Sequence, residues 1–222
     1  MLLTTRRCAT LARVAAIGQL KALIVAAPEE LRAELRGRNT SRQIDYCASL
    51  RERPARSLEH QATVRALRAT AQRIQLLQAE ADQLQAELTG LVGAVAPWLL
   101  EVPGVGPLSA AQVLVSWSHA GRFRSEAAFA ALAGTNPIPA SSGQVTRYRL
   151  NCGGDRQLNR AHTILLVRLR IDPDTRAYMA RRTAEGKSRR DAKRCLRRVL
   201  ARQLFRLLER YDRPGVEILR AT

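Results

Sequence analysis

The sequence predicts a mainly α-helical protein, in which a helical coiled-coil or hairpin region is followed by a compact helical domain containing a helix-hairpin-helix motif. Three observations support this fold class. Apolar residues recur at spacings of three and four through the first hundred residues, which is the period of a helix with one buried face. Proline and glycine gather in short segments between the helical stretches of the second half. The 222 residues are 46% hydrophobic, which is enough for a buried core and argues against general disorder.

The first region, residues 1–97, is expected to contain four helices. Their expected ranges are about 5–27, a short helix that starts at Pro28, about 41–51, and a long helix over about 57–95. Pro28 precedes Glu29 and Glu30, which favours a helix start because acidic side chains suit the positive end of the helix dipole.

The long helix carries an apolar seam that fits a heptad repeat over about four heptads. Its members are Leu67, Ile74, Leu77, Ala81, Leu84, Leu88, Leu91 and Val95. The seam predicts a coiled coil, within the chain or between chains, and a homo-oligomer would form through it. An intramolecular helical hairpin explains the same pattern equally well.

The second region, residues 98–211, alternates short helices with breaker loops, and residues 212–222 form a tail. Helices are expected over about 108–117, 125–133 and 156–170, from Asp172 onward, and over about 189–211, with a non-helical stretch at 134–143. Residues 144–150 alternate in hydrophobicity and are expected to form one arm of a β-hairpin.

The chain is strongly basic, with a formal net charge of +18 from 37 Lys and Arg against 19 Asp and Glu. Most of this charge lies in the second half. The excess favours a polyanionic partner such as nucleic acid. The last helix concentrates it, with arginines placed mainly away from the apolar stripe at Arg190, Arg194, Arg197, Arg198, Arg202 and Arg206. A solvated basic face would give the same pattern.

The rest of the composition argues against several other classes. Four cysteines and three histidines are scattered without metal-ligand spacing, so neither a disulfide scaffold nor a zinc site is indicated. Aromatic residues make up only 4% of the chain, which argues against base stacking as the main binding mode. No apolar run is expected to reach the length of a membrane span, and no signal-peptide core is evident. A cytoplasmic protein associated with the bacterial nucleoid is therefore expected.

Residues 99–111 carry the pattern apolar-Pro-Gly-apolar-Gly between two apolar stretches. Pro103 would end one helix, and Pro107 suits the first turn of the next. Gly104 and Gly106 permit backbone angles that are barred to other residues. This is the helix-hairpin-helix signature, whose backbone N–H groups bind phosphate. A plain helical turn is the alternative.

A possible nucleophile lies in the loop that follows. Ser141 and Ser142 precede Gly143, and a group of arginines comes next in the sequence: Arg147, Arg149, Arg156 and Arg160. A serine hydroxyl attacks a phosphodiester only when its proton is removed or the phosphorus is polarised, and arginines supply the second condition. The bond energy would be kept in a phosphoserine linkage, so strand exchange needs no nucleotide cofactor. A Ser-Ser-Gly turn without chemistry is the alternative.

The order of motifs from about Leu100 to Leu208 resembles the C-terminal domain of transposases of the insertion-sequence-110 family, relatives of the Piv/MooV DNA invertases. The matching segments are residues 102–107, 123–134, 137–143, 147–150 and 153–160. The helical first half resembles the coiled-coil segment of that family more loosely.

The resemblance implies DNA transposition or site-specific recombination guided by a structured RNA from the element. It assigns the family's nucleophile to Ser142, with Ser141 as the second choice. The family also has an N-terminal RuvC-like domain whose acidic residues bind Mg²⁺, and its dimers build composite sites from both domains. The residues expected to contact nucleic acid in this chain are Gly104, Gly106, Arg147, Arg149, Arg156, Arg160, Arg190, Arg194, Arg197 and Arg198.

The sequence departs from the family pattern in two ways. It begins at the coiled-coil region without a carboxylate-bearing RuvC-like domain, so a truncated copy with no cofactor of its own is expected. It also has one residue fewer than the family pattern before His162, which would rotate the following helical residues by about 100°. A non-catalytic helical nucleic-acid-binding protein is the first alternative, and a coiled-coil interaction protein is the second.

Overall fold

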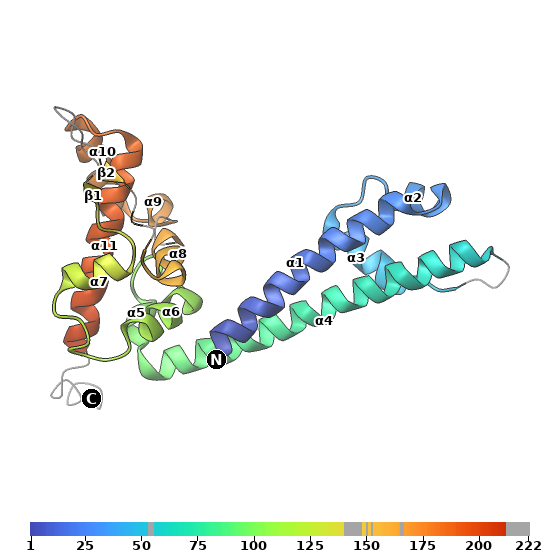
Figure 1. Ribbon diagram of the computed structural model, residues 1–222, viewed down its shortest axis with the longest axis horizontal. Coiled ribbons are helices and arrows are strands. Elements are labelled where there is room, and N and C mark those ends of the chain that lie inside the picture. The colour runs from blue at the N-terminus through green and yellow to red at the C-terminus, as the bar shows by residue number, and fades with distance from the viewer. Residues whose placement is uncertain (53–55, 140–147, 150, 152, 165–166, 212–222) are drawn as a thin grey trace. The chain divides into compact units, whose positions relative to one another are not determined.

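The computed structural model describes residues 1–52, 56–139, 148–149, 151, 153–164 and 167–211 (Figure 1). Within these ranges the chain forms eleven helices and two strands of two residues each, which confirms the mainly α-helical prediction. The chain divides into two compact units, Met1–Leu88 and Thr89–Thr222.

The first unit contains α1 (Leu2–Ala26), α2 (Glu29–Leu35), α3 (Thr40–Ser49) and most of α4 (Leu58–Val95). Local signals set these ends. Asn39 caps α3, because its side-chain oxygen accepts the backbone N–H of Arg42 at 2.9 Å. Pro28 precedes α2 as predicted, with acidic side chains in the first turn.

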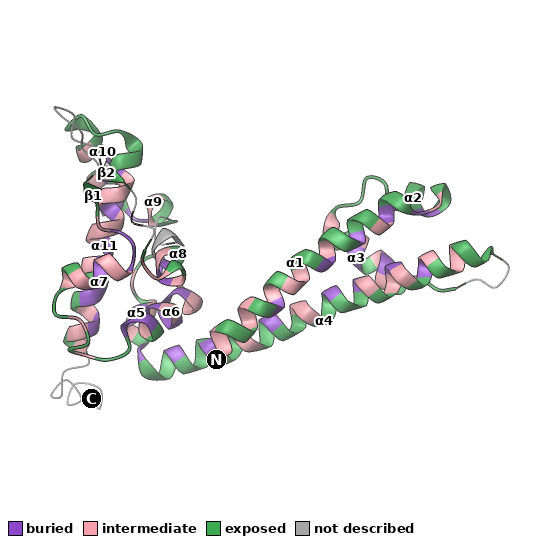
Figure 2. Cartoon of the chain, in the orientation of Figure 1, coloured by how far each residue is buried: buried purple, intermediate pink, exposed green. Residues whose placement is uncertain are grey.

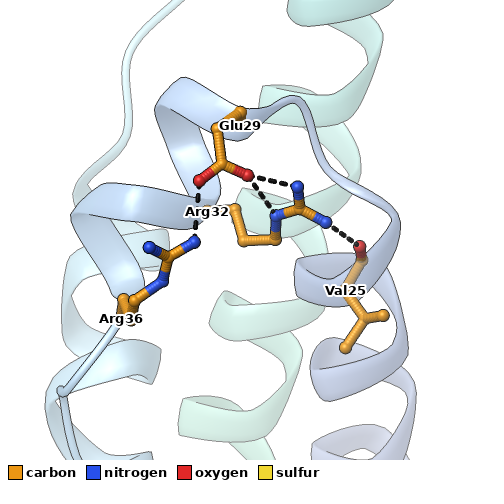
Figure 3. Close-up of polar contacts among 4 residues, drawn as sticks. All are labelled: Val25, Glu29, Arg32 and Arg36. Carbon is orange, nitrogen blue, oxygen red and sulfur yellow. Dashed lines mark hydrogen bonds and ion pairs between the residues drawn. The ribbon is translucent and has the colours of Figure 1, made fainter.

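The start of α2 is held by ionic contacts around Glu29 (Figure 3). Its carboxylate accepts hydrogen bonds from Arg32 and, at 2.7 Å, from Arg36, and Arg32 also reaches the carbonyl of Val25. The hydrogen bond from Arg32 is the main cause that holds the pKa of Glu29 below its ordinary value. These groups are exposed, so the contacts orient the turn more than they stabilise it.

The core of the first unit is formed by one face of each of the four helices (Figure 2). The most buried members are Leu20 on α1, Leu35 on α2, Cys47 on α3 and Leu67 on α4. Burial raises the pKa of the Cys47 thiol to about 11, so this cysteine stays protonated as a small core side chain.

Helices α1 and α4 run antiparallel within the chain. Near the start of α1, the Arg6 guanidinium donates to the side-chain oxygen of Gln85, at 2.7 Å, in the later turns of α4. Near the end of α1, Ile24 shares the core cluster with Val64 in the second turn of α4. The structure thus has the intramolecular helical hairpin, while a coiled coil between chains stays a prediction.

The predicted seam of α4 is correct at four positions spaced by seven residues, only partly correct between them, and wrong at its end. Leu67, Ile74, Ala81 and Leu88 are buried. Leu77 and Leu84 are half-buried, and Leu91 and Val95 are exposed. Val64, Ala71 and Val92, which the predicted seam does not include, are also buried.

Helix α1 also corrects an expectation about membranes. By length and composition alone, its 25 residues are long and apolar enough to cross a membrane, contrary to the expectation that no apolar run reaches that length. Core helices and N-terminal signal sequences meet the same criterion. In this structure α1 contributes Ala9, Ala16, Leu20 and Ile24 to the buried interior.

The second unit contains short helices and one two-stranded sheet before its last long helix. The helices are α5 (Pro97–Leu100), α6 (Pro107–Trp117), α7 (Glu126–Leu132), α8 (Arg156–Ile164), α9 (Arg168–Ile171), α10 (Pro173–Ala184) and α11 (Arg189–Tyr211). The strands are β1 (Ile138–Pro139) and β2 (Tyr148–Arg149). The expected helix over 156–170 is α8 followed by α9, with residues 165–166 outside the described ranges.

Helix α11 forms the spine of this unit, because α7, α8 and α10 all pack against it. Its buried face contains Ala192, Leu196, Leu200, Ala201, Leu204, Phe205 and Leu208. Phe205 meets Phe129 of α7 with ring centroids 5.6 Å apart, and Phe123 packs edge-on against both rings. Such aromatic contacts add about 0.5–1.5 kcal/mol each beyond the burial of their area.

We expect Leu67→Ala to destabilise the first unit by about 2–5 kcal/mol, because it leaves a cavity at a fully buried position of α4. Leu76→Ala is the matched control, since Leu76 lies on the same helix with 72% of its surface exposed. Urea unfolding followed by helical circular dichroism measures both variants. Tryptophan fluorescence would not suffice, because Trp98 and Trp117 belong to the second unit. Equal destabilisation of the two variants would contradict the core assignment.

Candidate nucleic-acid interface

The glycine turn between α5 and α6 is a close-packed loop that uses its two glycines differently. Gly104 has a φ of +79°, and a Cβ there would meet Cγ of Arg168 at 2.7 Å. Gly106 has a φ of −94° and open space around it, so the expectation that both glycines need unusual backbone angles is wrong for Gly106. Pro107 occupies the first turn of α6 as predicted.

The helix before this turn is shorter than the motif led us to expect. Helix α5 has only four residues and ends at Leu100, before Pro103. The turn nevertheless leads into α6, whose first backbone N–H groups have no side-chain cap from Gly106. A helix-hairpin-helix phosphate grip at Gly104 and Gly106 therefore remains a prediction.

Strands β1 and β2 form the base of the arm that carries the serine loop. They pair antiparallel, with Ile138 opposite Arg149 and Pro139 opposite Tyr148. The expected hairpin arm is therefore present at its base. Residues 140–147 lie outside the described residues, and with them the predicted nucleophile Ser142, its neighbour Ser141, and Arg147.

The base of the arm is fixed by a close backbone approach at Gly154. A Cβ on Gly154 would lie 2.3 Å from the carbonyl oxygen of Leu132 and 2.8 Å from the backbone nitrogen of Gly134. The N–H of Asp155 donates to the same Leu132 carbonyl at 2.7 Å. The chain that leaves the arm is thus packed directly against the chain that enters it.

Three asparagines complete this junction. Asn151 donates to the carbonyl of Ala131 at 3.1 Å and to the side chain of Asn136 at 2.6 Å. Asn159 on α8 donates to the carbonyl of Ala133 at 2.8 Å. Asn159 thus gives the Ala133 carbonyl a donor, and Asn151 adds a second donor to the Ala131 carbonyl, which also accepts the N–H of Gly134 at 3.0 Å.

Helix α11 joins the junction through Arg197. Its guanidinium donates to the side-chain and backbone oxygens of Asn159, at 2.6 and 3.1 Å. Burial lowers the pKa of Arg197, because the charged form is deprived of hydration. The Nε–H groups of Arg197 and Arg198 are buried without an acceptor among the described residues. Both arginines also line the pocket described next, where their charge suits an anionic ligand.

A pocket of about 500 Å³ opens where the arm base meets α11. Its lining includes Asn136 and Pro137, from the segment just before β1, and five cationic side chains: Arg149, Lys187, Arg194, Arg197 and Arg198. Asp191 is the acidic residue among the described lining residues. Its carboxylate accepts hydrogen bonds from the hydroxyl of Ser188 and, at 3.3 Å, from the guanidinium of Arg194. We name this the basic pocket. Its charge fits the phosphate groups of a nucleic acid.

The predicted contact residues are therefore only partly brought together. Arg149, Arg194, Arg197 and Arg198 share the basic pocket. Arg156 and Arg160 are exposed on α8, Arg190 is exposed at the start of α11, and none of these lines the pocket.

Two arginines of the basic face of α11 share one carboxylate within the unit. Arg202 and Arg206 both form ion pairs with Glu126 of α7, the second at 2.6 Å. The hydrogen bond from Arg206 is the main cause that lowers the pKa of Glu126. The interpretation of a continuous basic face was therefore too broad at these positions.

Sequence reasoning also missed residues that shape the pocket. Lys187 follows Gly186 in the turn before α11, and only its charge could have drawn attention to it. Asn159 lies in the matching segment 153–160, but nothing in the sequence assigned a role to Asn159 or Asn136, because an isolated asparagine is common in turns and on helix surfaces.

The carboxylates of the described residues do not fit a magnesium site. No group of three or more His, Cys, Asp or Glu side chains in the described part of the chain is placed to hold a metal ion. Asp155 instead caps α8, where its side chain accepts the N–H of Gln157 at 2.8 Å and the hydroxyl of Ser116 at 2.6 Å.

Comparison with known proteins gives the second unit a family resemblance. Residues 96–180 match the family described as Transposase IS116/IS110/IS902 family. A curated relative, the insertion element IS110 uncharacterized 43.6 kDa protein of Streptomyces coelicolor, is 34% identical over 129 residues. The aligned region covers 56% of this chain and 32% of the relative, so the chain spans about a third of that protein's length. Both matches support an IS110-type transposase domain, and the family match places it at residues 96–180.

We expect Gly154→Ala to destabilise the second unit by about 1–3 kcal/mol, because backbone atoms cannot move aside as a side chain can. Gly153→Ala is the matched control, since its Cβ would meet only the side-chain oxygen of Asn151, at 3.4 Å. Urea unfolding followed by tryptophan fluorescence measures both variants. A Gly154→Ala protein as stable as Gly153→Ala would disprove the close approach.

The capping of α8 predicts a pH dependence. Burial raises the pKa of Asp155, but hydrogen bonds from Ser116 and from the backbone N–H groups of Leu158 and Gln157 outweigh it, so the net pKa is below the ordinary 3.8. The stabilisation is therefore complete above the unfolded-state pKa and disappears as the pH falls through the lower folded-state value.

We expect wild-type protein to exceed Asp155→Asn in unfolding free energy at pH 7, and the difference to shrink below about pH 4. Urea unfolding over a pH series measures this difference. A gap that stays constant between pH 7 and pH 3 would show that the charge of Asp155 contributes nothing.

Proposed function

We propose that the second unit is the DNA-binding, strand-transferring domain of a transposase, with Ser142 as its nucleophile and Ser141 as the second choice. One combined observation carries the proposal: a stretch similar to the IS110 transposases contains the arm that bears both serines, and the base of that arm opens on a pocket with five cationic side chains. Covalent geometry supports the pairing. Ser142 is three residues from Pro139, and three extended residues span at most about 11 Å.

In the proposed step, the Oγ of Ser142 attacks the phosphorus of a DNA phosphodiester. A bond forms between Oγ and phosphorus, the bond from phosphorus to one sugar oxygen breaks, and the hydroxyl proton passes to the departing sugar oxygen. The product is a phosphoserine ester and a free DNA hydroxyl. Attack by a second DNA hydroxyl on the same phosphorus reverses the bonding and joins the new strand. No nucleotide is consumed.

The arginines of the basic pocket would stabilise charge on the non-bridging oxygens during this step. Arg197 suits the task because Asn159 already fixes its guanidinium, so little reorganisation is needed. Arg149 joins it from the arm itself, and Arg194 and Arg198 from α11. The remaining predicted residues would hold flanking backbone: Gly104, Gly106, Arg147, Arg156, Arg160 and Arg190.

The wider assembly is also part of the proposal. A guide RNA would accompany the DNA, and a second copy of the chain would associate through the long helix. Any Mg²⁺ chemistry of the whole transposase would need carboxylates beyond those of the described residues, and no step above is routed through a metal.

DNA binding is tested by salt dependence. We expect the double variant Arg194→Ala/Arg198→Ala to bind duplex DNA more weakly and to reduce the slope of log K against log salt by about 0.9 for each phosphate that the protein no longer neutralises. The double variant Arg42→Ala/Arg73→Ala, which removes the same charge from the first unit, is the control and should bind nearly as wild type. Equal weakening in the two double variants would indicate a general charge effect without a basic pocket.

The nucleophile is tested by covalent trapping on end-labelled DNA from an element junction, with its guide RNA present. We expect a protein–DNA adduct that disappears in Ser142→Ala and persists in Ser141→Ala. An adduct retained by Ser142→Ala rejects that residue as the nucleophile. Tight, salt-dependent binding without any adduct would favour the non-catalytic nucleic-acid-binding alternative.

A further inference from the structure

A second pocket, of about 560 Å³, lies in the second unit beside the glycine turn. Its walls come from α5, the turn that follows α5, and the last turns of α11. Trp98 and Tyr211 stack within it, with ring centroids 4.5 Å apart and planes inclined by 10°. Leu200 and Leu204 supply buried apolar surface. We name this the aromatic pocket. Its volume is in the range of small-ligand sites.

The rim of the aromatic pocket is polar and carries more positive than negative charge. Its exposed polar side chains are Glu101, Gln203, Arg206 and Arg210. Arg206 shares the carboxylate of Glu126 with Arg202, and the Arg168 guanidinium is paired with Asp172 at 2.8 Å. Arg210 lies 5.9 Å from the ring of Tyr211, where it reinforces the aromatic face.

We propose that the aromatic pocket receives an unpaired nucleobase of the DNA bound by this unit. The inference rests on the proposed function. Trp98 and Tyr211 each cover one face of the other ring, so the base would stack on the outer face of the Trp98 indole. The polar edges of the base would hydrogen-bond to the amide of Gln203 and the guanidinium of Arg210. Strand transfer supplies the occupant, because strands that are broken and rejoined expose bases that a duplex keeps stacked.

The two tryptophans of the unit are held in different ways. The indole N–H of Trp117 donates to Glu209 at 2.9 Å, and this side chain is buried. The indole N–H of Trp98 has no acceptor among the described residues, and Trp98 is only half-buried. Trp98 is thus placed by packing and by its stacking on Tyr211, which leaves part of the indole at the edge of a pocket.

The aromatic pocket and the basic pocket use different stretches of α11. The basic pocket takes residues between Asp191 and Arg198, and the aromatic pocket takes residues between Leu200 and Tyr211. The two linings have no residue in common. Substitutions in one pocket therefore leave the side chains of the other in place, and their effects can be measured separately.

The test uses the full chain and two single-stranded probes: an oligo(dT) and an abasic oligonucleotide of the same length, which carries equal phosphate charge without bases. We expect oligo(dT) to quench tryptophan fluorescence more strongly and to bind about 5-fold or more tightly than the abasic probe. In Trp98→Leu the extra quenching and the extra affinity should both vanish, while binding to duplex DNA stays within about 2-fold. Trp98→Phe keeps a ring and should retain most of the affinity, and helical circular dichroism checks the fold of each variant.

Several outcomes would overturn the proposal. Equal affinity of wild-type protein for the two probes would show that bases are not contacted, and duplex binding that remains salt-dependent would leave the proposed function standing. Retention of base-dependent binding by both Trp98→Leu and Tyr211→Leu would place the bases elsewhere. Absence of salt-dependent binding to any of the probes would overturn the proposed function together with this inference.

Discussion

The close contact between Gly154 and the backbone at Leu132 and Gly134 is the constraint on which the candidate interface depends. It brings the two ends of the serine arm together at a distance that no side chain allows. The pairing of β1 with β2 follows from it, because the strands leave the junction side by side. Arg149 then stands at a defined place, one residue beyond Tyr148. The junction also orients Asn159, and through it Arg197.

The basic pocket is a composite of this junction and α11. The junction lies within residues 96–180, the part that matches the transposase family, whereas α11 begins at Arg189. Lys187 and three arginines of the pocket therefore come from chain beyond the matched stretch. The bond from Arg197 to Asn159 joins the two parts. Arg197 therefore has two roles. Its hydrogen bonds to Asn159 hold α11 against α8, and its guanidinium adds positive charge to the basic pocket.

The sequence predicted local features well, because local chemistry determines them. Pro28, Pro107 and Pro173 stand before or in the first turn of helices, and Ser125 caps α7 by accepting the N–H of Ala128. The heptad frame of α4 was half correct, since Leu91 and Val92 fit an apolar seam almost equally and only packing decides between them. For the same reason the sequence did not decide whether α4 packs against a helix of its own chain or of a second copy, because one apolar face can pack against either.

Contacts between distant residues could not be predicted in this way. Arg197 meets Asn159 across 38 positions, and Arg206 meets Glu126 across 80. The sequence does not distinguish an arginine that is paired with a carboxylate of the same protein from one whose guanidinium can bind a ligand. The predicted nucleophile is a further case: the motif assigns a role to Ser142, but the described residues reach only the base of its arm.

Ion pairing divides the charge of α11 into two parts with different chemistry. Toward its start, Arg194, Arg197 and Arg198 line the basic pocket together with Arg149 and Lys187, and Asp191 is the carboxylate among the described lining residues, so an anion gains Coulomb energy there. Farther along, Arg202 and Arg206 share the carboxylate of Glu126, which offsets part of their charge, and the surface beside them is aromatic and apolar. A phosphate gains less at that end, and a base gains more. The arrangement of charge on one helix thus separates the two kinds of group that a nucleic-acid strand presents, and it does so with residues that a count of arginines would have treated alike.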